Sequence, residues 1–161
     1  MSGEVLSLES IVVKGDRVEA EVVVAEQAYR YTTPQLAERI LARFPQLLLH
    51  TCKNEKGHTF ASAIEHTSLP HVLEHLIIEL QVQAAAGISP DSTSSPGNSP
   101  ASTSLTTQAE GISPCTTYVG NTQWICRDEG RARVAVSFTD DLVALRAFRD
   151  AANFLNQTVI Q

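Results

Sequence analysis

Two histidines and a glutamate are spaced so that they could share one metal or catalytic site. The stretch Thr67 to Gln81 contains His71, Glu74 and His75 in an H-x-x-E-H pattern. Residues four apart lie one turn apart on the same side of an α-helix, so both imidazoles could reach one tetrahedral zinc ion. A carboxylate between them is placed to take a proton from water at that metal. The pattern predicts a zinc site with His71 and His75 as ligands and Glu74 as the general base.

The same stretch has the signals of a helix. Thr67 or Ser68 offers an N-cap oxygen, and Pro70 suits the first turn. At about 100° per residue the apolar residues form a core-facing stripe and the polar residues take the other side. The apolar stripe consists of Val72, Leu73, Leu76, Ile77 and Leu80. The polar side consists of His71, Glu74, His75 and Glu79. H-x-x-E-H occurs in inverzincin metallopeptidases, but a short pattern also fits a solvated polar face.

Secondary candidates for the site lie before and after this helix. All five histidines fall between His50 and His75, and such clustering is what a metal or proton-transfer site needs. His50 and Cys52 could form a ligand pair, although a capped loop with a buried thiol is the simpler interpretation. Glu79 is a further candidate on the polar side of the helix. Thr139 or Asp140 is expected to cap the last predicted helix, and Asp140 and Asp141 lie at its start, where acidic residues favour the helix dipole.

Composition excludes several classes of function. The chain has 161 residues, 43% hydrophobic and 19% charged, which is ordinary for one globular domain. Its net charge of −6, without a basic run, argues against nucleic acid and anionic membrane surfaces and is compatible with an arginine-bearing ligand. No apolar run approaches the roughly 20 residues of a membrane span. Three cysteines at unrelated spacings and an N-terminus without signal-peptide features lead us to expect a cytoplasmic protein without disulfides.

The order of predicted elements indicates an α+β fold. Residues 1–161 are predicted to form one domain with a mainly antiparallel four-stranded sheet and about three helices packed on it, in the order β-β-α-α-β-β-α. We predict strands over 5–13, 17–25, 116–126 and 131–138, helices over 34–43, 67–81 and 141–157, and a loop over 50–66. Residues 87–114 are rich in Ser, Thr, Pro and Gly. Because such a segment buries too little apolar surface to offset its ordering entropy, it is predicted to be a disordered insertion.

Phe60 to Gln81, FASAIEHTSLPHVLEHLIIELQ, resembles the N-terminal domain of cyanophycin synthetases. The resemblance extends to residues 37–52, AERILARFPQLLLHTC, and to the closing strand-strand-helix over 121–156. The insertion is the main departure. The ATP-grasp and Mur-ligase-like modules of such synthetases have no room in this chain. We therefore expect a free-standing version of the N-terminal domain rather than a polymerase.

The resemblance also implies roles for individual residues. In the family this domain holds the Asp-Arg polymer, and some members are similar to a metallopeptidase half-domain and cut the polymer with a bound zinc ion. Carried over, His71 and His75 would be ligands and Glu74 the base. The third ligand would be Asp141, or less favourably Asp140. Cleaving members have Glu at that place, and a shorter Asp alters the metal geometry.

Three hypotheses from different classes follow. The first is a zinc-dependent hydrolase that cleaves peptide bonds of cyanophycin-like or other Asp/Arg-rich polymers or peptides. The second is a non-catalytic module that binds such a polymer or a protein. The third is a structural subunit that pairs with another chain or with a second copy of itself. Metal content separates the first hypothesis from the other two.

Overall fold

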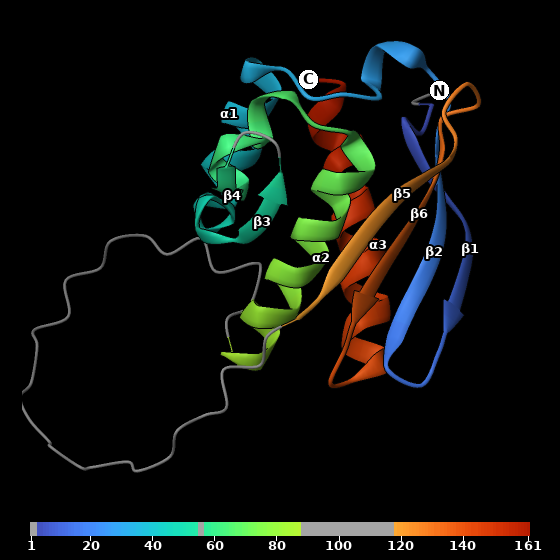
Figure 1. The fold of residues 1–161 in the computed structure, drawn as a ribbon, viewed down its shortest axis with the longest axis vertical. Helices are drawn as coiled ribbons and strands as arrows, with labels where there is room; N and C mark the ends of the chain where they lie inside the picture. The colour runs from blue at the N-terminus through green and yellow to red at the C-terminus, as the bar shows by residue number, and fades with distance from the viewer. Residues whose placement is uncertain (1–2, 55–56, 88–117) are drawn as a thin grey trace, which may run out of the picture.

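Four antiparallel strands form the sheet on which the helices pack (Figure 1). The computed structural model describes residues 3–54, 57–87 and 118–161. Within these residues the strands are β1 (Leu6–Val13), β2 (Arg17–Val24), β5 (Gly120–Cys126) and β6 (Arg131–Ser137). Their order in the sheet is β1-β2-β6-β5. The predicted α+β class and the four-stranded antiparallel sheet are confirmed. The predicted insertion over 87–114 lies outside the described residues apart from Gly87.

Strand alternation explains which face of the sheet carries the core. Every second residue of the two central strands is buried, and the residues between them are partly or fully exposed. A strand turns successive side chains to opposite faces, so one face packs on helices and the other remains polar. The buried set is Val18, Ala20, Val22, Val24, Ala132, Val134 and Val136.

Two long helices lie against each other on that face (Figure 1). They are α2 (Leu69–Ala85) and α3 (Asp141–Val159), and the shorter α1 (Pro34–Arg43) packs on α3. Each helix has a side-chain cap that accepts a backbone N–H in the first turn: Thr33 for α1, Asp140 for α3 and, for α2, Ser68, which is one of the two predicted candidates. Capping oxygens satisfy donors that a helix leaves unpaired at its start.

The stretch predicted as a loop over 50–66 contains regular structure. It forms a small hairpin of β3 (Thr51–Asn54) and β4 (Gly57–Thr59), followed by the 3₁₀ turns η3 (Phe60–Ser62) and η4 (Ile64–His66). The 3₁₀ turn η2 (Pro45–Leu49) precedes it, and another, η1 (Gln27–Tyr29), follows β2. The loop prediction was wrong because these pieces are too short to show a period. They matter because β3 runs beside the first half of α2 (Figure 1).

A buried arginine joins the sheet to the start of α2. The guanidinium of Arg30 donates to four carbonyl oxygens, those of Val24 (3.1 Å), Ala25 (3.0 Å), Arg127 (2.8 Å) and Asp128 (3.0 Å). Its own carbonyl accepts the N–H of Leu69 at 2.8 Å. Gly130, at φ 69°, lets the β5–β6 turn lie against this guanidinium, because a Cβ there would meet the Val24 carbonyl. Arg30 therefore helps to place the first turn of α2.

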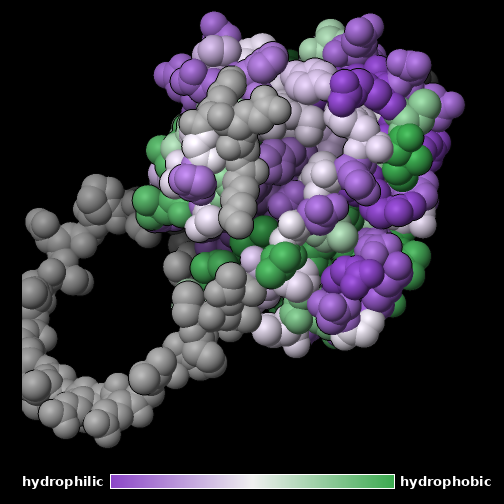
Figure 2. All heavy atoms as spheres, in the orientation of Figure 1, coloured by the Kyte–Doolittle hydropathy of each residue, from purple (hydrophilic) through white to green (hydrophobic). Residues whose placement is uncertain are grey.

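None of the helices in the described part of the chain is both long enough and apolar enough to cross a membrane. Hydrophilic residues cover much of the face shown in Figure 2, and the hydrophobic residues there form small separate groups.

We predict that Arg30→Met lowers the free energy of unfolding by about 2–4 kcal/mol, because it leaves several carbonyls without their charged donor. Denaturant unfolding followed by circular dichroism measures the change. Arg146→Met, at an exposed position of α3, is the matched control and should stay within about 0.5 kcal/mol of the wild type. Equal effects of the two substitutions would contradict a role for the Arg30 hydrogen bonds.

Candidate functional site

Helix α2 is buried on nearly all sides, including the side that carries its polar residues. Glu74, His75 and Glu79 are only 6%, 3% and 5% exposed. The alternative of a solvated polar face is therefore wrong. The apolar stripe packs on the sheet and on α3. Cys52 of β3, Phe60 of η3 and Thr122 of β5 contact the polar side. A buried polar group without a partner costs free energy, so each of these side chains needs one.

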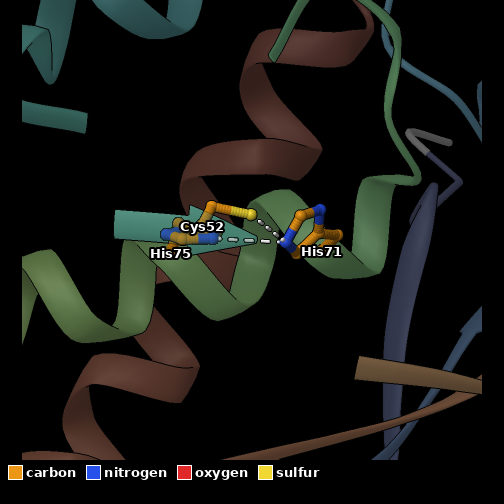
Figure 3. Close-up of side chains that lie close together, drawn as sticks. All are labelled: Cys52, His71 and His75. Carbon is orange, nitrogen blue, oxygen red and sulfur yellow. Dashed lines mark hydrogen bonds between the residues drawn. The ribbon is translucent and has the colours of Figure 1, made fainter. Parts of the chain in front are cut away.

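Three potential metal ligands meet on this covered side (Figure 3). The Nε2 atoms of His71 and His75 are 3.2 Å apart, and the Sγ atom of Cys52 on β3 is 3.4 Å from His71 Nε2. The ligand atoms of these three residues all lie within 4.8 Å of one another. Within the described residues this is the only group of three or more His, Cys, Asp or Glu side chains so arranged.

Surrounding side chains hold the two imidazoles. The phenyl ring of Phe60 stacks on His75, with centroids 4.0 Å apart and planes at 22°, and meets His71 edge-on. The Nδ1 atom of His71 is 2.8 Å from the Thr67 hydroxyl, and that of His75 is 3.1 Å from Nδ1 of His50. Both rings thus have their Nδ1 atoms occupied and their Nε2 atoms turned toward Cys52.

Burial changes the proton affinity of these groups. It lowers the pKa of His71, and it lowers that of His75 to about 3, with the nearby His71 and His50 adding to the effect. Burial raises the pKa of Glu74, against a smaller opposing effect of its hydrogen bond from Thr122. Desolvation disfavours the charged form of each group. The two histidines are therefore neutral at pH 7, which is the state in which imidazole binds metals.

Strand β5 supplies the partner of Glu74. Gly120, Thr122 and Trp124 alternate with more exposed residues and turn toward α2. The hydroxyl of Thr122 donates a short hydrogen bond to Glu74 Oε2. Gly120 leaves room for the carboxylate, since a Cβ there would lie 2.6 Å from Glu74 Cγ and 2.7 Å from Cδ. A glycine is required by this close approach rather than by its backbone angles.

A cleft of about 820 Å³ opens onto this group. Cys52, His71, Glu74 and His75 line it on one side, and Gly120, Thr122 and Trp124 line it on the other. The residues that carry the donor atoms and the carboxylate therefore border this cleft.

The structure brings together most of the predicted site residues but not all of them. His71, Glu74, His75 and the secondary candidate Cys52 lie at the cleft, and His50 and Glu79 lie behind His75. Asp140 is the exposed N-cap of α3, and Asp141, also exposed, is not part of the ligand group.

The reason for this placement of Asp141 is the course of the two long helices. Gln81, in the second half of α2, donates to the carbonyl of Ser137, just before α3 begins. His71 lies in the first turn of α2, about 15 Å back along the helix axis at 1.5 Å per residue. Asp141, at the start of α3, therefore lies near the C-terminal half of α2, whereas His71 lies near the N-terminus of α2. The group of potential ligands that the structure brings together contains Cys52 and not Asp141.

Sequence reasoning missed Thr67, Phe60, Gly120 and Thr122 as parts of the site. Alternation in β5 identifies the residues that face α2, but only after the neighbour of β5 is known. Which helix β5 packs against depends on the order of the strands in the sheet, and no local sequence pattern gives that order.

Comparison with protein families places the chain in one of them. The profile described as "Cyanophycin synthase-like N-terminal domain" matches residues 17–102. The match covers more than half of the chain and includes every residue of the ligand group, so the chain belongs to this family. No curated protein and no solved structure matches the sequence.

We predict that Gly120→Ala displaces the Glu74 carboxylate and lowers the free energy of unfolding by about 1–3 kcal/mol, as overpacking does in other interiors. In a Glu74→Ala background the same substitution should cost less than half as much, because the obstructing atoms are gone. The resulting double-mutant cycle isolates the contact. Gly15→Ala is the control, since an added Cβ there meets nothing within 4 Å. Equal costs in both backgrounds would contradict this packing of Glu74.

Proposed function

We propose that this member of the cyanophycin synthase-like N-terminal domain family is a zinc-dependent hydrolase that cleaves peptide bonds of an Asp/Arg-rich polymer. The observation that carries the proposal is the convergence of three donor atoms beside a buried carboxylate at an open cleft. Catalytic zinc sites use three protein ligands of this kind and keep a further position open.

The donor set fits zinc in chemistry, and two of its three donor–donor distances fit zinc in spacing, the third lying within 4.8 Å. Two imidazole nitrogens and one thiol sulfur are ligands that zinc prefers. At ordinary bond lengths, a tetrahedral zinc ion holds two nitrogens about 3.3 Å apart and a nitrogen and a sulfur about 3.6 Å apart. The corresponding distances here are 3.2 Å for His71 and His75 and 3.4 Å for Cys52 and His71. We therefore propose Cys52, His71 and His75 as the ligands, with Cys52 in the role expected of Asp141.

Glu74 has the position and the environment of a general base. When bound, zinc would supply Lewis-acid polarisation of the substrate carbonyl. Glu74 would take the proton of the attacking water and deliver it to the leaving amine. Burial makes the carboxylate a stronger base, because it raises the pKa toward the working pH. The hydrogen bond from Thr122 orients Oε2 and leaves Oε1 for the proton.

The proposed substrate class follows from the family rather than from the cleft alone. A polymer of aspartate and arginine is what the resemblance implies, and a negatively charged protein suits the cationic side chains of such a polymer. The cleft lies at the surface, which a long substrate requires.

A non-catalytic polymer-binding module is the second candidate, favoured by one feature of the ligand group. Thiolate ligands are common in structural zinc sites, and Cys52 lies on the small hairpin of β3 and β4, which has little core of its own. In that case zinc would tie this hairpin to α2, and Glu74 would serve only as a partner of Thr122.

The first prediction of the proposal concerns the ligands. The wild-type chain should bind about one Zn²⁺, measured by competition with a chromophoric chelator. Cys52→Ser and His71→Ala should weaken binding by more than the roughly 10–100-fold typical of residues that only support a ligand. Asp141→Asn should leave the affinity unchanged. Loss of binding in Asp141→Asn, with normal binding in Cys52→Ser, would restore the ligand set predicted from the family.

The second prediction concerns Glu74 and separates the two candidates. Glu74→Gln should retain Zn²⁺ and reduce hydrolysis of Asp/Arg polymer by about 10²–10⁴-fold, as removal of a general base does. Shortened polymer or released dipeptide is measured at equal zinc occupancy. Glu65→Gln, at an exposed position on η4, is the matched control and should keep full activity. A zinc-loaded wild type without activity on such polymers would favour the binding module.

A further inference from the structure

A chain of three side chains runs from His75 away from the cleft. The Nδ1 atom of His75 is 3.1 Å from Nδ1 of His50, and Nε2 of His50 is 2.8 Å from Oε2 of Glu79. Glu79 is buried, and the His50 side chain is only 13% exposed. The proposed zinc chemistry uses neither residue directly, so their arrangement calls for another explanation.

The carboxylate at the end of the chain sets the direction of its hydrogen bonds. The hydrogen bond from His50 lowers the pKa of Glu79, so the carboxylate is ionised and can only accept. Nε2 of His50 must therefore carry the proton. When Nε2 carries the only ring proton of His50, its Nδ1 atom accepts and Nδ1 of His75, 3.1 Å away, is the donor.

This direction leaves the Nε2 atom of His75 without a hydrogen, so its lone pair can accept from Nε2 of His71, 3.2 Å away, or bind a metal. That atom is the one that faces His71 and Cys52 in the ligand group (Figure 3). The opposite tautomer would place a hydrogen at Nε2 and block a metal. Beside metals, a carboxylate commonly accepts a hydrogen bond from the ring nitrogen of a histidine that does not bind the metal, and so orients that histidine. Here the imidazole of His50 lies between the carboxylate of Glu79 and His75.

We propose that His50 and Glu79 are positioning residues that hold His75 in the tautomer able to ligate a metal ion. This inference rests on the proposed function for the metal, but it makes a claim about the metal-free protein as well. The tautomer of His75 is set by Glu79 before any metal arrives. A metal that finds the imidazole already in this form needs no proton rearrangement at that ligand.

The primary test is nitrogen NMR on the full-length, ¹⁵N-labelled chain, freed of metal with a chelator at pH 8. Long-range ¹H–¹⁵N correlations distinguish protonated from unprotonated ring nitrogens. In the wild type, His75 should be protonated at Nδ1 and His50 at Nε2. In Glu79→Gln the preference should be lost, because an amide both donates and accepts. Glu65→Gln is the matched control and should leave both tautomers unchanged.

Zn²⁺ affinity provides the second measurement. His50→Phe removes the acceptor for His75 and should weaken Zn²⁺ binding by about 10–100-fold. His50→Asn, whose amide oxygen can occupy the place of Nδ1, should recover part of that loss. His66→Phe is the control, because His66 is exposed and stacks on Tyr31 away from the ligand group. The free energy of unfolding of each variant separates a loss of affinity from a loss of fold.

The outcomes separate this inference from the proposed function. A wild-type His75 protonated at Nε2, or a Glu79→Gln variant with unchanged tautomer and affinity, would overturn the positioning role while leaving the zinc site standing. Zn²⁺ binding with the expected tautomers but without hydrolysis would overturn the proposed function alone. A wild type that binds no Zn²⁺ would overturn both.

Discussion

The structure depends on how a nearly fully buried helix accommodates polar side chains. Helix α2 lies between the sheet, α3 and the segment that carries Cys52 and Phe60, so most side chains of its first half are buried, the polar ones included. Each buried polar group must be satisfied within the protein. Glu74 is hydrogen-bonded to the Thr122 hydroxyl, and Gln81 to the Ser137 carbonyl. His50 is hydrogen-bonded to both His75 and Glu79. Among the described residues, no buried side-chain nitrogen or oxygen is left without a partner.

These requirements shape the elements around α2. Strand β5 carries a glycine and a threonine on its helix-facing side, where an apolar strand would have larger residues, because Glu74 needs both space and a donor. The hairpin after η2 brings His50 and Cys52 to the other side of the helix. Arg30 ties the beginning of the helix to the sheet through backbone carbonyls. Phe60, Thr67 and His50 then hold the imidazoles in place. A metal site requires preorganisation of this kind.

The sequence predicts those parts of this arrangement that have local signals. Strand alternation, the N-caps Ser68 and Asp140, and the prolines at the starts of α1 and α2 place the main elements to within a few residues. Helical spacing also identifies His71, Glu74 and His75 as neighbours. It cannot show that their side of the helix is buried, because the covering elements are a short hairpin and a polar edge strand that carry little hydrophobic signal. Asp141 illustrates the same limit. A local sequence signal places it at the start of a helix, but the part of α2 that lies next to it depends on how the two helices pack.

If Cys52, His71 and His75 hold one zinc ion, as proposed, a sulfur atom must be among its ligands. X-ray absorption at the zinc edge of the zinc-loaded wild-type protein tests it most directly, because the technique reports ligand type and bond length together. We expect one sulfur ligand at about 2.3 Å from the zinc and nitrogen ligands at about 2.0–2.1 Å. A shell of nitrogen and oxygen alone, without sulfur, would contradict this expectation.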